Sequence, residues 1–154
     1  MNKITSTALT VTIGAGLIAV STPTAHAAPS LRSKALATAA KQKNDPYKKG
    51  ATGPNKFDCS GLTYYSYKQH GKKLPRTAQG QYNKSSKVSA SKRAKGDLVF
   101  IGTNAKNIYH VGIYAGNGKM WNANTGSYRG KKVVLAPISE YTKGSPKAYY
   151  GRIK

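Results

Sequence analysis

Cysteine is nearly absent from this chain of 154 residues. Cys59 is the only one, so no disulfide can form within the chain, and a single thiol cannot build a thiolate metal cage. Carboxylates and histidines are also too few to suggest a cluster of metal ligands, and we expect no metal and no other cofactor. Cys59 is therefore either an inert structural thiol or a nucleophile.

Negative charge is equally scarce. The sequence has 26 Lys+Arg against 4 Asp+Glu, a formal net charge of +22, and such a field attracts polyanions. The basic residues occur singly and in pairs, without a nucleic-acid-binding motif or a ladder of base-stacking aromatics. We therefore expect diffuse attraction to anionic polymers and no specific nucleic-acid binding. The alternative is that the lysines only keep the protein soluble and bind no particular partner.

Long apolar runs are absent beyond the N-terminus. Residues 1–27 have the features of a secretory signal peptide: the positive charge of Lys3, a short apolar run over residues 8–20, and a small-x-small site at residues 25–27. We expect cleavage after residue 27 and one exported domain without a membrane segment, working extracellularly or at the cell wall as a monomer. An uncleaved membrane anchor is the alternative.

Helical periodicity comes first along the chain and strand-like alternation follows, which indicates an α+β fold with a mostly antiparallel sheet. An N-terminal helical segment is expected at residues 28–45, with Ser30 capping a helix over 31–43. Further helices are expected at 59–70 and 77–83. The predicted strands are 97–101, 108–114, 119–124, 133–135 and 148–153, and the predicted loops are 46–57 and 84–95.

Cys59 lies at one of the predicted helix starts. Asp58 is the expected N-cap, and Gly71 is the expected stop. The unpaired N–H groups and the positive end of the helix dipole favour a thiolate at this position. Gly61 would allow another backbone or a substrate to approach the first turn. We therefore favour a nucleophile over a structural thiol.

His110 is the most plausible base for this thiol. It lies in the predicted strand 108–114, where Gly112 shares its face and leaves space beside it. A satisfied strand histidine is the alternative. His70 is instead the last residue of the predicted helix 59–70, where a cation complements the dipole, so we predict a structural role for it.

A third group must hold the tautomer of a catalytic imidazole, and strand register decides which group can. We predict a three-residue hairpin loop at residues 116–118. In that register Asn122 lies diagonal to His110 on the same face, whereas a two-residue loop would turn it to the other face. Asn124 would directly oppose His110 and is the rival candidate.

Taken together, these motifs resemble the NlpC-type cell-wall cysteine peptidases, which are small bacterial papain-like hydrolases. The resemblance covers residues 46–154 and rests on Pro46-Tyr47, Pro54, Phe57-Asp58-Cys59-Ser60-Gly61-Leu62, Leu74-Pro75-Arg76-Thr77, Gln81, Gly96-Asp97-Leu98-Val99-Phe100 and His110-Val111-Gly112-Ile113-Tyr114. It implies a papain-like catalytic domain over 46–154, with N-terminal helices and the nucleophile helix packed on a sheet of five to six strands.

The resemblance also implies roles for individual residues. Cys59 would be the nucleophile, His110 the general base and Asn122 its orienter. Tyr47 and the Cys59 N–H would support the thiolate or the oxyanion. The expected contacts to substrate are Asp58, Ser60, Arg76 and Gln81, with Arg129 as a further candidate. For Arg76 and Arg129, a solvated surface position is the alternative.

The implied substrate is peptidoglycan, cut in its stem peptide between D-glutamate and a diamino acid, with anionic wall polymers as further partners. The alternatives are an amidase or cross-bridge peptidase on the same scaffold, or a non-catalytic cationic wall-binding domain.

Two positions depart from the family pattern. Lys49-Gly50-Ala51 replaces a common Trp-Gly-Gly, which changes the expected substrate groove. Asn122 stands where a histidine is usual. Its amide oxygen can accept the imidazole N–H, so we expect activity to survive.

Overall fold

The computed structural model describes residues 14–21, 27–126 and 129–154. Much of the predicted signal peptide lies outside these ranges, so cleavage after residue 27 stays a prediction. In the described part of the chain, no helix is both long and apolar enough to cross a bilayer.

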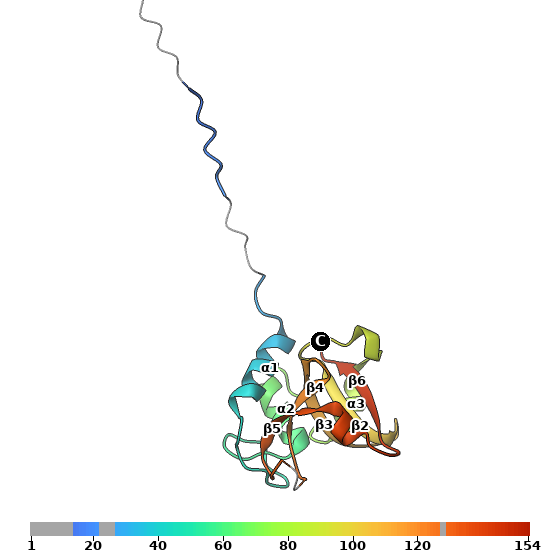
Figure 1. Cartoon of the computed structure of the whole chain (residues 1–154). Coiled ribbons are helices and arrows are strands. Elements are labelled where there is room, and N and C mark those ends of the chain that lie inside the picture. Colours follow the sequence, from blue (N-terminus) through green and yellow to red (C-terminus); the bar gives the residue numbers. More distant parts are fainter. Residues whose placement is uncertain (1–13, 22–26, 127–128) are drawn as a thin grey trace, which may run out of the picture.

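The described residues form one six-stranded antiparallel sheet with three α-helices packed against it (Figure 1). The strands are β1 (Ser86–Val88), β2 (Leu98–Asn104), β3 (Asn107–Gly116), β4 (Lys119–Ala123), β5 (Val133–Pro137) and β6 (Lys147–Arg152). Their order in the sheet is β1-β6-β2-β3-β4-β5. The helices are α1 (Leu31–Lys41), α2 (Cys59–Lys68) and α3 (Ala78–Lys84), with short 3-10 helices η1 (Ala90–Lys92) and η2 (Ile138–Tyr141). The predicted α+β architecture is confirmed.

Each α-helix begins at a side chain that caps it. Ser30, Asp58 and Thr77 each accept a hydrogen bond from the backbone N–H three residues further on. The predicted caps of the first two helices are therefore confirmed. Beyond the end of α2, the imidazole of His70 bonds to the Thr38 hydroxyl of α1 at 2.8 Å, which agrees with a structural role.

One predicted loop is partly regular. Residues 84–95 contain β1 and η1, so the prediction of a loop there is wrong. β1 is short and mostly exposed, and it pairs with β6 at the edge of the sheet. The pairing depends on a strand far along the chain, and three residues are too few to show an alternation.

Alternation along the strands separates the apolar side chains into two clusters. One lies under the helices and includes Leu62 of α2 with Phe100 and Val111 of the sheet. The other lies on the opposite face, where Ile138 of η2 covers Met120. Because α2 packs on β3, the start of α2 is held near the middle of the sheet.

Asp97 joins the N-terminal helix to the sheet. Its fully buried carboxylate accepts hydrogen bonds from Arg32 of α1 at 2.8 Å and from Arg152 of β6 at 2.8 Å. The Ala94 N–H donates to it as well. Burial alone would raise the pKa of Asp97, but these hydrogen bonds outweigh it and hold the pKa below its ordinary value.

Replacing Asp97 by asparagine should destabilise the fold, because both arginines lose their counter-charge. We expect a loss of about 2–4 kcal/mol in the free energy of unfolding, measured with urea at pH 7. The stabilisation is present above the ordinary carboxyl pKa and is lost as the pH falls through the lowered pKa of Asp97. The difference between the two proteins should therefore shrink in acid.

Asp45→Asn is the matched control, because the structure gives its carboxyl no side-chain partner among the described residues. Equal stability of Asp97→Asn and Asp45→Asn would contradict the role given to Asp97.

Candidate active site

Cys59 is the first residue of α2 and is partly buried. The Asp58 carboxylate caps the helix by accepting the Gly61 N–H at 2.7 Å. Glycine is required at position 61, because a Cβ there would lie 2.0 Å from the Ala51 backbone oxygen. The preceding loop therefore packs tightly on the first turn, and the thiol faces the Val111 N–H of β3.

The β3–β4 hairpin determines the face on which Asn122 lies. Ile113 pairs with Trp121, so Asn122 falls on the face of His110 and the predicted register is confirmed. The predicted three-residue loop is wrong, because a bulge next to Gly116 leaves a two-residue turn. Gly116 adopts a φ of +90°, which glycine tolerates better than other residues.

His110 and Asn122 form the central hydrogen bond of the site. Both are buried, and His110 Nε2 lies 3.0 Å from Asn122 Oδ1. An amide oxygen can only accept, so Nε2 carries the proton and Nδ1 is the basic nitrogen. The Asn122 amide nitrogen donates to the Val134 carbonyl of β5 at 3.4 Å, which fixes the orientation of the amide.

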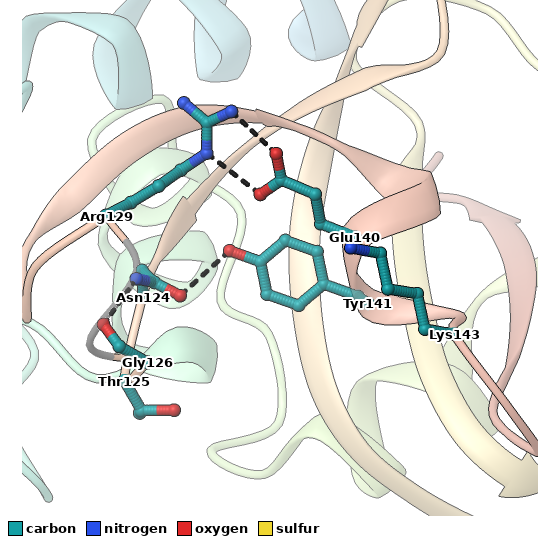
Figure 2. A pocket seen from close by; sticks show the side chains of 7 residues that line it. All are labelled: Asn124, Thr125, Gly126, Arg129, Glu140, Tyr141 and Lys143. Carbon is teal, nitrogen blue, oxygen red and sulfur yellow. Dashed lines mark hydrogen bonds and ion pairs between the residues drawn. The ribbon is translucent and has the colours of Figure 1, made fainter.

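Asn124, the rival orienter, holds Tyr141 instead of His110. Its amide nitrogen donates to the carbonyls of Gly126 and Gly130, and its Oδ1 accepts the Tyr141 hydroxyl at 2.9 Å (Figure 2). The Tyr141 ring stacks on the imidazole of His110, with 5.1 Å between centroids and 5° between planes. Sequence reasoning missed Tyr141, because it lies in η2 and belongs to no recognised motif.

Burial keeps the thiol and the imidazole uncharged. It lowers the pKa of His110 to about 4, against which the Asn122 hydrogen bond acts in the raising direction. Burial also raises the pKa of Cys59, and the negative charge of Asp58 adds to this. Backbone N–H groups, including that of Val111, act in the opposite direction on the thiol. At neutral pH the Cys59 thiol and the His110 imidazole are therefore both uncharged.

Tyr47 lies near the Cys59 thiol. Burial raises the pKa of Tyr47, and the charge of the Cys59 thiolate is the next largest cause, which places the phenol close to the sulfur. Its backbone N–H donates to the Lys131 carbonyl at 2.9 Å, and its backbone bridges to Phe57. The position agrees with the supporting role expected for this residue, which stays a prediction.

Three of the predicted substrate contacts lie together beside Cys59. Arg76 donates to Asp58 Oδ2 at 2.6 Å and to Ser60 Oγ at 2.8 Å. With Cys59 they line an open groove of about 470 Å³. The Arg76 side chain is 38% exposed, so a ligand in the groove can reach the guanidinium.

Gln81 does not lie in this groove. It is fully buried, and its amide oxygen accepts the Thr63 hydroxyl at 2.6 Å. Its amide nitrogen donates to the carbonyls of Ser60 and Pro75. Gln81 therefore stabilises the first turn of α2 from the interior of the protein, and the structure leaves none of its surface exposed for the predicted contact with substrate.

A second pocket, of about 460 Å³, is lined by Tyr141 (Figure 2), whose ring stacks on the imidazole of His110. Arg129 lies in its wall and forms a bidentate ion pair with Glu140, at 2.9 and 2.6 Å. Lys143 lines it too. No three metal-ligating side chains cluster within the described residues.

Known proteins share this sequence pattern. Residues 44–149 match the model of the NlpC/P60 family. The probable endopeptidase Cgl2188 of Corynebacterium glutamicum is 41% identical over 125 residues, which is 80% of this chain and 54% of that protein. The bifunctional muramidase/DL-endopeptidase CwlT of Bacillus subtilis is 47% identical over 89 residues, 56% of this chain and 27% of that protein. The chain spans about half, or less, of the length of these relatives.

Solved structures share the fold. The NlpC/p60 domain of the peptidoglycan hydrolase SagA has a TM-score of 0.68 at 30% identity, covering 79% of this chain and 98% of that one. RipD of Mycobacterium tuberculosis, described as a non-catalytic NlpC/p60 domain protein adapted to peptidoglycan binding, has a TM-score of 0.65 at 26% identity, covering 82% and 100%. One fold thus occurs in a hydrolase and in a non-catalytic protein, and the side chains of the site must distinguish them.

The imidazole of His110 should titrate with a midpoint of about pH 4, because burial disfavours its charged form. NMR titration of the ring measures this directly. Asn122→Ala should lower the midpoint further, since the lost hydrogen bond favours the protonated ring. Asn83→Ala, at an exposed position on α3, should leave it unchanged. A midpoint at or above the ordinary value of about 6.5 would contradict the neutral resting pair.

Proposed function

Because this chain belongs to the NlpC/P60 family, we propose that it is a secreted cysteine peptidase that hydrolyses peptide bonds in the stem of peptidoglycan. The observation that carries the proposal is the buried hydrogen bond between His110 and Asn122, on the strand that faces the Cys59 thiol. This arrangement supplies a nucleophile, a base with one available nitrogen, and a group that fixes the tautomer.

The reaction is acyl transfer to water. His110 Nδ1 accepts the thiol proton as Cys59 Sγ bonds to the carbonyl carbon, and the Cys59 N–H stabilises the oxyanion. The imidazolium then donates its proton to the leaving nitrogen, and the C–N bond breaks to give a thioester. A water molecule gives a proton to His110 and attacks the thioester, and the released thiolate takes that proton back.

Asn122 and Tyr141 keep the imidazole in place during these steps. The proton on Nε2 stays bonded to Asn122, so only Nδ1 exchanges protons with substrate. Tyr141 covers one face of the ring and is itself held by Asn124. Tyr47 supports the charge that develops at the sulfur or the oxyanion.

The groove beside α2 suits an acyl group that carries a carboxylate. Arg76 and Ser60 present a guanidinium and a hydroxyl next to Cys59, which match the free carboxylate of a D-glutamyl residue. CwlT, a relative with this domain, is named a DL-endopeptidase. We therefore place the scissile bond between D-glutamate and the following diamino acid.

A non-catalytic wall-binding domain is the second candidate, because RipD is such a protein on the same fold. The net charge of +22 would serve binding to anionic wall polymers in either case. The complete set of Cys59, His110 and Asn122 favours the enzyme, since binding alone requires none of this geometry.

Digestion of purified peptidoglycan, followed by mass spectrometry of the released fragments, tests the proposal. The wild type should release fragments with a new N-terminal diamino acid. Cys59→Ala should reduce release by roughly a thousandfold or more, because the nucleophile is lost. His110→Ala should do the same, whereas the matched variant His70→Ala should retain activity.

Sedimentation with the wall supplies the control for binding. Cys59→Ala should sediment with peptidoglycan as the wild type does. If the wild type sediments in a salt-sensitive way but releases no more than Cys59→Ala, the chain is a binding domain and the peptidase proposal fails.

A further inference from the structure

Two pockets lie near the residues of the proposed reaction, one lined by Cys59 and the other by Tyr141, whose ring stacks on His110. The groove described above is lined by the start of α2, including Cys59 and Ser60. The pocket in Figure 2, here called the Tyr141 pocket, is lined by Tyr141 and Asn124, which lie next to His110, and by no residue of α2. The pockets therefore differ in which of the two residues, Cys59 or His110, they adjoin.

The chemistry assigns a substrate half to each pocket. The acyl carbon becomes bonded to Cys59 Sγ at the start of α2, with its oxyanion on the N–H groups there. The leaving nitrogen must instead accept a proton from the His110 imidazolium. In the proposed reaction the acyl half of the substrate therefore lies at the start of α2, and the leaving nitrogen lies beside His110.

The wall of the Tyr141 pocket carries a net positive charge. Arg129 and Lys143 are its cations, and Glu140 is its one acidic lining residue. Both carboxylate oxygens of Glu140 are bonded to Arg129. Lys143 is exposed and forms no ion pair among the described residues. It nevertheless lies close to Glu140, because its charge helps to lower the pKa of that carboxyl, although Arg129 has the larger effect. The Lys143 ammonium group is therefore available to bind an anionic group of the substrate.

We propose that the Tyr141 pocket binds the leaving half of the substrate and that Lys143 binds a carboxylate of the leaving amino acid. This inference rests on the proposed function and adds a specificity to it. A leaving residue with a free carboxylate is preferred over the same residue with a carboxamide, because the amide offers no charge to Lys143.

Paired substrates test this specificity. Two synthetic stem peptides are compared, identical except for a free carboxylate or a carboxamide on the leaving residue. The wild type should cleave the carboxylate peptide with a kcat/KM about tenfold higher, mainly through a lower KM. Lys143→Gln should lose roughly fivefold to tenfold on the carboxylate peptide and change little on the amide. Arg129 is less suitable for mutation, because replacing it would also remove the ion-pair partner of Glu140.

Lys147→Gln is the matched control. Lys147 is another exposed lysine, on β6, which does not line the Tyr141 pocket, and its removal changes the net charge by the same amount. It should leave both substrates unaffected. The inference is overturned if Lys143→Gln slows both peptides alike, if it slows neither, or if Lys147→Gln has the same effect.

Binding separates this inference from the proposed function. If the wild type cleaves neither peptide, the peptidase proposal fails, and calorimetry with Cys59→Ala still tests the pocket. The carboxylate peptide should then bind more tightly than the amide, and adding Lys143→Gln should remove the difference. Equal affinities of Cys59→Ala for the two peptides would overturn the inference.

Discussion

The pairing register of β3 and β4 is the constraint on which the site depends. A slip of one residue would turn Asn122 to the opposite face of the sheet and leave His110 without its acceptor. The bulge next to Gly116 preserves the register although the turn has only two residues. Once Asn122 holds Nε2, the free Nδ1 can serve the thiol, and the stacked ring of Tyr141 limits the motion of the imidazole.

Burial gives this pair its electrostatic character. In a chain with a net charge of +22, the Cys59 thiol and the His110 imidazole are both uncharged at rest, because desolvation disfavours each ion. In the proposed reaction, proton transfer must therefore accompany attack on the carbonyl. Within the described residues, all four side-chain ion pairs use arginine and none uses lysine. The arginines thus stabilise the structure through ion pairs. The lysines supply a diffuse positive potential that would favour binding to an anionic cell wall.

Local signals in the sequence were enough for the framework of the site. Asp58 as a cap, Cys59 at a helix start, and the face of Asn122 all follow from neighbouring residues or from a single hairpin. The roles of Gln81, Tyr141 and β1 depend on contacts between distant segments, which no local pattern records. The family motif predicts a substrate contact for Gln81, but a buried residue that stabilises a helix and a residue that contacts substrate cannot be told apart in sequence.

A covalent acyl group on Cys59 is the central claim, and trapping it is the most direct test. Substrate is mixed rapidly with the protein, and the reaction is quenched in acid. The protein is then digested, and the mass of the fragment containing Cys59 is measured by mass spectrometry. We expect a transient mass increase equal to the acyl half of the substrate, carried on Cys59 and absent in His110→Ala. Turnover that continues in Cys59→Ala, or that proceeds with the acyl group on another residue, would contradict the account.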